Sequence, residues 1–98
     1  MNRQFCIYIM TNKHNKTIYT GVTGNLIGRV DQHRTGKIGG FTRKYNLNKL
    51  VYYEVYEDPE SAILREKQIK SWNRKRKDDL INALNPQWRD LYSDLVDE

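Results

Sequence analysis

The amino-acid sequence predicts a single α+β domain in which a three-stranded sheet is flanked by helices. Three observations lead to this prediction. The chain has 98 residues, the length of one domain. Its apolar side chains first alternate, as in strands, and later recur with a helical period, in the order β-β-α-β-α-α. With 38% hydrophobic and 30% charged residues, the chain suits a compact domain with a heavily charged surface.

The first two strands are predicted to form a hairpin. Apolar side chains alternate between Phe5 and Thr11, and a second β-favouring stretch covers residues 17–23. A polar turn cluster at residues 12–16 separates the two stretches, so the strands should pair antiparallel. Gly21 within the second strand indicates a bulge or a close approach of backbone.

The first helix is predicted over residues 26–35, because Asn25 is a suitable N-cap and Gly36 a suitable terminator. Gly28 inside this helix costs about 1 kcal/mol relative to alanine, and the sequence offers no reason for it. The apolar stripe of the helix is expected to consist of Leu26, Ile27 and Val30.

A loop rich in glycine and polar residues is expected over residues 36–46, before the strongest strand signal of the chain at residues 49–57. The helical connection between the second and third strands favours a parallel relation between them, so the simplest strand order is 2-1-3. Asp58-Pro59 then combines an N-cap with proline at the first helical position. The sequence therefore predicts a helix over residues 59–72.

The C-terminal third is expected to be helical as well. A short helix is predicted over residues 77–84, stopped by Asn85-Pro86, and a last turn or helix over residues 88–95. No repeat or linker interrupts the sequence. We therefore expect one domain over residues 1–98, with a core from about 4 to 84 and the segment 85–98 packed back on it.

The location of the protein is suggested by what the sequence lacks. Its apolar stretches are far shorter than the roughly 20 residues that span a bilayer. The N-terminus shows neither the apolar core nor the cleavage site of a signal peptide. The single cysteine, Cys6, rules out an internal disulfide and a cysteine-based zinc site. We expect a cytoplasmic protein with no membrane contact.

The net charge of +5 is concentrated in one part of the chain. Residues 65–77 hold seven basic side chains and one acidic one, whereas residues 85–98 are net acidic. Such a basic stretch fits a polyanion partner, and the alternative is a solvated helix face. Its basic members are Arg65, Lys67, Lys70, Arg74, Lys75, Arg76 and Lys77.

Two groups on the predicted helices could carry chemistry. Arg29 and His33 lie four residues apart and could both reach a phosphate; the alternative is an arginine lying over the core and a histidine bonded to a backbone carbonyl. Glu66 projects among the predicted buried residues Ala62, Ile63 and Ile69. A carboxylate placed there needs a partner, either a hard cation such as Mg²⁺ or a basic side chain in a structural salt bridge.

Two tyrosines on the predicted hairpin, Tyr8 and Tyr19, could stand side by side on one face of the sheet. The alternative is ordinary sheet packing, since tyrosine is a common strand residue. The residues alone do not decide between these two roles.

Several motifs, in order and at compatible spacing, resemble the GIY-YIG nuclease superfamily, in particular its small stand-alone bacterial branch, which is similar to the N-terminal domain of an excinuclease. The resemblance covers nearly the whole chain. The motifs are Cys6-Ile7-Tyr8, Tyr19-Thr20-Gly21 and residues 25–33, 40–45, 50–54, 62–72 and 84–92.

The resemblance implies an antiparallel three-stranded sheet and a metal-dependent endonuclease that hydrolyses phosphodiester bonds of DNA with Mg²⁺ or Mn²⁺, in DNA repair or recombination. The alternative is a nucleic-acid-binding module of the same fold that is non-catalytic or depends on a partner for turnover. An additional protein partner is compatible with either reading. The oligomeric state and the DNA structure recognised stay open.

The resemblance also implies roles for individual residues. Tyr8 and Tyr19 would contact water and phosphate, Arg29 would stabilise negative charge, and Glu66 would hold the metal. Val22 stands where some branches carry a catalytic lysine, which leaves Tyr19 or His33 as the general base. Gly21 and Asn85 would support the site. Phosphate contacts would come from Arg43, Lys44, Lys67, Lys70, Arg74, Lys75, Arg76 and Lys77.

Overall fold

The computed structural model describes residues 4–97. Residues 1–3, which contain part of the N-terminus considered for a signal peptide, and residue 98 lie outside the described range. No helix within that range is long and apolar enough to cross a membrane. The elements, in order, are β1 (Phe5–Thr11), β2 (Ile18–Thr23), α1 (Leu26–Arg34), α2 (Phe41–Lys44), β3 (Lys49–Tyr56), α3 (Pro59–Lys70), α4 (Arg74–Leu84) and α5 (Tyr92–Val96).

The sheet has the predicted order β2-β1-β3, and both outer strands run antiparallel to β1. β2 and β3 are therefore parallel to each other without being neighbours, which is what the helical connection between them predicts. The α+β class and the strand order are confirmed. A register shift between Ile9 and Met10 leaves Val51 as an extra residue in β3.

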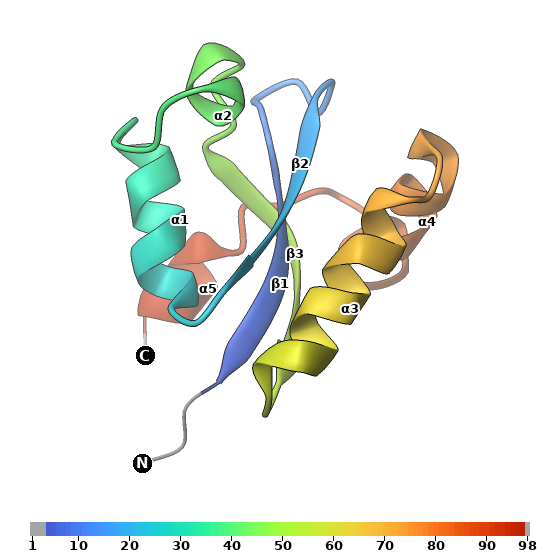
Figure 1. Cartoon of the computed structure of the whole chain (residues 1–98). Coiled ribbons are helices and arrows are strands. Elements are labelled where there is room, and N and C mark those ends of the chain that lie inside the picture. Colours follow the sequence, from blue (N-terminus) through green and yellow to red (C-terminus); the bar gives the residue numbers. More distant parts are fainter. Residues whose placement is uncertain (1–3, 98) are drawn as a thin grey trace.

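Helices cover both faces of the sheet: α1, α2 and α5 lie on one side and α3 and α4 on the other (Figure 1). Because side chains alternate along β1, its residues supply both cores. Ile7 and Ile9 pack with Ala62, Ile69 and Ile81 under α3 and α4. On the opposite face, the buried cluster consists of Tyr8, Met10, Val30, Leu47 and Leu50.

Side-chain caps decide where the helices begin. Asn25 accepts a hydrogen bond from Gly28 N at 3.1 Å, and Asp58 accepts one from Ser61 N at 2.8 Å. Asn73 caps α4 in the same way, at 2.9 Å from Arg76 N. This cap starts α4 at Arg74, so the predicted start at residue 77 was wrong by three residues.

The cap of α1 also explains the glycine that the sequence left unexplained. A Cβ on Gly28 would lie 2.4 Å from Nδ2 of Asn25, closer than atoms can approach. The Asn25 side chain thus folds over Gly28 to reach its amide. The helix propensity lost by having glycine at position 28 is offset by the N-cap hydrogen bond from Gly28 N to the Asn25 side chain.

Three local predictions were wrong. The segment 36–46 is not only loop, since it contains the short helix α2. Ile27 is 44% exposed, because the buried side of α1 is formed by Val30 and His33. Ile63 is 40% exposed, because Ala62 and Ile69 form the buried side of α3. In both helices an apolar residue next to the stripe points to solvent.

The C-terminal segment returns to the start of β3. Asp90 accepts hydrogen bonds from Leu50 N and Tyr92 N, each at 3.1 Å, and Leu91 N donates to Leu50 O at 2.7 Å. Leu91, Tyr92 and Leu95 pack against the cluster that contains Tyr8. This segment therefore closes the α1 side of the sheet.

Candidate active site

Three aromatic side chains come together on the α1 side of the sheet. Tyr8 comes from the central strand β1, Tyr19 from β2 and His33 from α1. The ring centroids of Tyr8 and Tyr19 are 6.3 Å apart, and that of His33 lies 5.6 Å from Tyr8 and 5.8 Å from Tyr19. The structure thus brings together the two tyrosines and the histidine that the sequence singled out.

Gly21 makes room for Tyr8. The two residues are partners in the β1–β2 ladder, and the Tyr8 ring lies across the glycine. A Cβ on Gly21 would be 2.5 Å from both Cζ and the hydroxyl oxygen of Tyr8. Any side chain at this position would displace the phenol. The close approach at Gly21 is therefore made by a side chain, not by backbone or a bulge as the sequence suggested.

A buried hydrogen bond of 3.0 Å joins the Tyr8 hydroxyl to Nε2 of His33. Burial raises the pKa of the Tyr8 phenol far above its ordinary value; Tyr19 adds to the rise, and the charge of Arg29 opposes it. Burial, and secondly the charge of Arg29, lower the pKa of His33. Both shifts favour a neutral pair at pH 7, in which one ring nitrogen of His33 can accept a proton.

The second ring nitrogen of His33 is also buried, and Nδ1 has no hydrogen-bond partner within residues 4–97. The sequence-based alternative, a histidine satisfied by a backbone carbonyl, is therefore not what the structure shows. A buried polar atom left in this state costs free energy. Its presence beside two tyrosine rings is more typical of a functional site than of a core.

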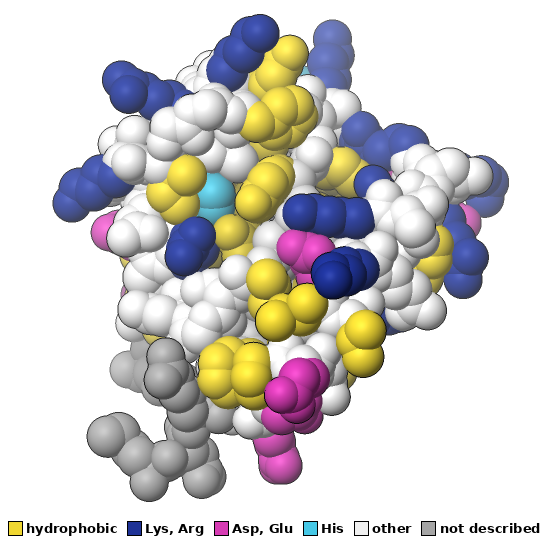
Figure 2. All heavy atoms as spheres, in the orientation of Figure 1, with side chains coloured by type: hydrophobic (Ala, Val, Ile, Leu, Met, Phe, Trp, Pro, Cys, Tyr) yellow, Lys and Arg dark blue, Asp and Glu magenta, His cyan; other side chains and the backbone are white. Residues whose placement is uncertain are grey.

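Arg29 lies on the exposed side of the same helix as His33. Its charge acts on both members of the buried pair, since it lowers the pKa of Tyr8 and of His33. Its guanidinium is therefore close to the pair while it remains open to solvent. Figure 2 shows Lys and Arg side chains spread over this face of the molecule.

Glu66 reaches the same region from α3, which packs against β1 and the edge strand β2. Its side chain is only 14% exposed, and it lies 3.2 Å from Nζ of Lys70. The same ammonium group lies 5.6 Å from the centre of the Tyr19 ring. The salt bridge considered as an alternative from the sequence is present, and it holds Glu66 beside the tyrosines.

Glu66 supplies a single carboxylate. No group of three or more His, Cys, Asp or Glu side chains within residues 4–97 could enclose a metal ion. This donor set is unsuited to a structural zinc site. It fits Mg²⁺, which often binds one or two protein carboxylates and takes its other oxygens from water and phosphate.

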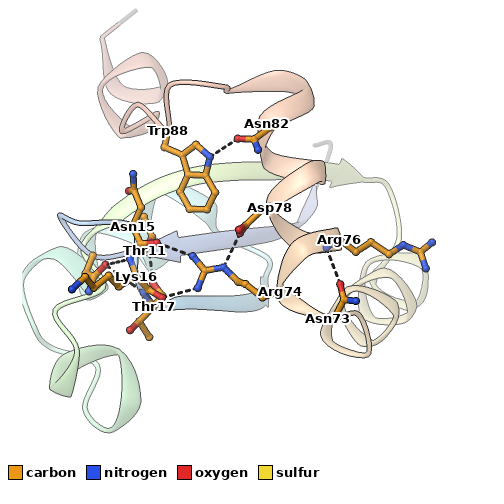
Figure 3. Close-up of polar contacts among 11 residues, drawn as sticks. Thr11, Asn15, Lys16, Thr17, Asn73, Arg74, Arg76, Asp78, Asn82 and Trp88 are labelled. Carbon is orange, nitrogen blue, oxygen red and sulfur yellow. Dashed lines mark hydrogen bonds and ion pairs between the residues drawn. The ribbon is translucent and has the colours of Figure 1, made fainter.

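Two arginines of the basic stretch 65–77 make hydrogen bonds and ion pairs that stabilise the fold. Arg74 donates from Nη1 to Lys16 O at 2.6 Å and from Nη2 to Asn15 O at 2.7 Å, and it pairs with Asp78 at 2.7 Å (Figure 3). It therefore ties the β1–β2 turn to α4. Arg65 is similarly engaged with Glu54, at 2.9 Å.

The other predicted phosphate contacts lie at the surface to different degrees. Arg43, Lys44, Lys67, Lys70, Lys75 and Arg76 are exposed and Lys77 is half-buried. Lys75 pairs with Asp79 at 3.1 Å, and the Arg76 guanidinium lies 4.1 Å from the centre of the Trp72 ring. Within residues 4–97, Lys67 and Lys77 form no ion pair, which leaves their charges uncompensated.

Asn85 lies at the end of α4 and is buried. Its Nδ2 donates to Val51 O at 3.0 Å and to Arg89 O at 2.9 Å, and its Oδ1 accepts from Arg89 N at 3.0 Å. Both the amide nitrogen and the amide oxygen of the Asn85 side chain are hydrogen-bonded to backbone groups. Asn85 therefore holds the C-terminal segment against β3.

Two features were missed in the sequence. Lys70 was assigned only to DNA contact, yet it bridges Glu66 and Tyr19; its spacing of four residues from Glu66 was the available signal. Phe41 and Tyr45 form an exposed aromatic pair on α2. Their spacing around Arg43-Lys44 was visible, but the predicted loop gave no reason to place them on one side.

Several known proteins are similar to this chain in sequence. The model of the GIY-YIG catalytic domain matches residues 4–79. A UPF0213 protein of Clostridium perfringens is 38% identical over 77 residues, covering 79% of this chain and 82% of the relative. A UPF0213 protein of Haloquadratum walsbyi is 32% identical over 80 residues, covering 82% and 89%.

A similar fold is found in the solution NMR structure of a UPF0213 protein from Bacillus halodurans. The TM-score is 0.58 at 24% sequence identity, and the match covers 92% of this chain and 95% of the other. The matched range 4–79 contains the aromatic cluster, Arg29 and Glu66.

Proposed function

Because this chain belongs to the GIY-YIG family of catalytic domains, we propose that it is a metal-dependent endonuclease that hydrolyses phosphodiester bonds of DNA. The observation that carries the proposal is the proximity of the buried Tyr8 and His33, and of Tyr19, to Arg29 and Glu66. Those residues come from β1, β2, α1 and α3, so only the fold joins them. A role in cytoplasmic DNA repair or recombination is part of the same proposal.

The buried pair supplies a path for a proton. Water attacks phosphorus and loses a proton to the Tyr8 oxygen, while the Tyr8 hydroxyl proton moves to Nε2 of His33, 3.0 Å away. The phosphodiester P–O bond breaks as the new P–O bond forms, and the departing oxygen takes a proton from solvent. Tyr19 lies beside Tyr8 and orients the water. In this scheme His33, rather than Tyr19, is the general base.

Negative charge develops on the phosphate as the bond breaks. Arg29 is exposed beside the pair, so its guanidinium can bind the phosphate oxygens and stabilise that charge. Glu66 would hold a divalent cation, which when bound polarises the phosphate. Lys70 pairs with Glu66 at 3.2 Å, and the same ammonium group lies 5.6 Å from the centre of the Tyr19 ring, so it links the carboxylate to the aromatic cluster.

A second function has a specific observation in its favour. Exposed cations dominate this surface, and Lys67 and Lys77 have no ion pair within the described residues. Phosphate binding without cleavage needs only these charges. The second candidate is therefore a nucleic-acid-binding module that needs a protein partner for turnover.

The test is cleavage of labelled DNAs (duplex, flap, branched and single-stranded) with Mg²⁺ or Mn²⁺. We expect cutting by the wild-type protein, lost by about 100-fold or more in Glu66→Gln and in Arg29→Ala. Matched controls are Glu60→Gln, an exposed carboxylate at the start of the same helix, and Arg89→Ala, an exposed arginine of the C-terminal segment. Both controls should cut normally.

The two candidate functions predict different outcomes. Metal-dependent cutting that vanishes in both site variants and persists in both controls supports the nuclease. Binding that weakens steeply with salt, with no cutting of any substrate, supports the binding module instead. Binding that is insensitive to salt contradicts both.

A further inference from the structure

The aromatic pair on α2 is unusual for its exposure. Among the large hydrophobic side chains that are exposed within residues 4–97, Phe41 (49%) and Tyr45 (40%) are the two aromatic ones. Their ring centroids are 4.8 Å apart and the ring planes are tilted by 53°. Aromatic side chains exposed in pairs are costly to solvate and mark binding surfaces more often than chance.

The backbone holds these rings in place. Two glycines with positive φ, Gly36 at 72° and Gly40 at 76°, set the path into α2. On the inner side, Thr42 and Leu47 are buried, and Leu47 N donates to Thr42 O at 2.9 Å. Since α2 is anchored through these buried residues, Phe41 and Tyr45 are presented outward by a fixed segment.

The surroundings are strongly basic. Between Gln32 and Tyr53 the chain has no acidic residue and five Lys or Arg residues. Lys44 lies with Nζ 5.4 Å from the centre of the Tyr45 ring, and the neighbouring Arg43 is exposed. Aromatic faces interleaved with cations are the combination that binds single-stranded nucleic acid, because bases stack while phosphates pair.

The pair also lies toward the proposed active site. Leu47, which anchors the segment, packs in the same buried cluster as Tyr8. Figure 2 shows hydrophobic side chains between α2 and the β1–β2 hairpin, with basic side chains to either side. A strand held at the site could therefore extend over α2.

We propose that Phe41 and Tyr45 form a stacking platform for an unpaired base of the nucleic acid whose phosphate lies at the site of Tyr8, Tyr19 and Arg29. This inference rests on the proposed function for the identity of the ligand as nucleic acid. It adds a substrate class: DNA with at least one unpaired nucleotide beside the bound phosphate. A continuous duplex keeps its bases stacked on each other and leaves the platform unused.

The test measures binding without cleavage. The Glu66→Ala protein in EDTA is titrated with a fluorescein-labelled single strand of thymidines and with a blunt-ended, fully paired duplex that carries the same number of phosphates. When Phe41→Ala and Tyr45→Ala are both added to this Glu66→Ala protein, single-strand binding should weaken by about tenfold or more. Duplex binding should weaken by less than about twofold. Ile27→Ala, which removes an exposed aliphatic side chain of α1, should leave both unchanged.

Two further variants separate stacking from loss of folding. Phe41→Trp keeps a ring, so it should bind the single strand as tightly as the parent. The strand should also quench its fluorescence more than that of the parent, which already contains Trp72 and Trp88. Phe41→Leu keeps apolar area without a ring and should bind more weakly. Equal weakening on single strand and duplex, or full binding with Phe41→Leu and no extra quenching of Phe41→Trp, would overturn the platform.

The outcome is independent of whether the protein cuts DNA. If the wild-type protein cuts nothing but single-strand binding depends on the two rings, the platform stands and the nuclease proposal fails. If cleavage depends on Glu66 and Arg29 but binding ignores the rings, the nuclease stands and the platform fails.

Discussion

The hydroxyl group of Tyr8 and Nε2 of His33 are 3.0 Å apart in the interior of the protein, although 25 positions separate the two residues in the chain. The bond joins the central strand to the first helix, and it directs two titratable groups toward each other where burial keeps both neutral.

If Tyr8 and His33 act as one proton-accepting unit, removing either should cost about as much as removing both. We expect Tyr8→Phe and His33→Gln each to lower the cleavage rate by about 100-fold. The double variant should be little worse than either single one. Losses that multiply in the double variant would show that the two residues act separately.

The lowered pKa of His33 predicts how stability depends on pH. The unfolded chain binds a proton at the ordinary value of 6.5, whereas the folded chain takes it up only at lower pH. The free energy of unfolding should therefore fall as the pH is lowered from 7 through 6.5 toward the folded-state pKa, and then level off. Urea titrations of the wild type and His33→Gln, which should lack this loss, provide the comparison.

Gly21→Ala should damage the site more than the fold. The added methyl group would lie 2.5 Å from the Tyr8 hydroxyl oxygen, so the phenol has to move away from His33. We expect a loss of cleavage of about tenfold or more, with a destabilisation of about 1–3 kcal/mol. Gly39→Ala is the matched control, because a Cβ there meets nothing within 4 Å. Normal cleavage by Gly21→Ala would contradict this account of the glycine.

Asn85→Ala should destabilise the protein by about 2–3 kcal/mol, because it leaves backbone groups of Val51 and Arg89 without their partner. Asn85→Asp retains the acceptor for Arg89 N but removes both donors, so it should also be destabilising. Thermal unfolding measures both, with the exposed Gln87→Ala as control. Unchanged stability with lost cleavage would instead assign Asn85 a direct role in the reaction.

Arg74 and Lys75 are adjacent, but they should respond differently to substitution. Arg74→Ala removes the bonds to Asn15 O and Lys16 O that hold the β1–β2 turn, and should cost about 1 kcal/mol of stability. Lys75→Ala removes only an exposed ion pair with Asp79 and should be within about 0.5 kcal/mol of wild type. Equal stability of the two variants in denaturant unfolding would show that the turn does not depend on Arg74.

The local pattern of the sequence was sufficient for the strands and for most helix positions. Alternation from Phe5 to Thr11 placed β1, and Asp58-Pro59 placed the start of α3, because strand pleating and N-caps depend on neighbouring residues only. The order 2-1-3 followed from a general rule on connections.

What the sequence by itself determined was therefore the identity of the elements and a short set of candidate residues. Only the tertiary structure decided which of those residues meet. It places the Tyr8 hydroxyl within hydrogen-bond distance of His33, and it engages the side chains of Arg74 and Asn85 in hydrogen bonds to backbone groups. It also turns Phe41 and Tyr45 outward together. The physical reason is that such contacts join residues far apart in the chain, or depend on which side of a short helix is buried, and neither is encoded in local spacing.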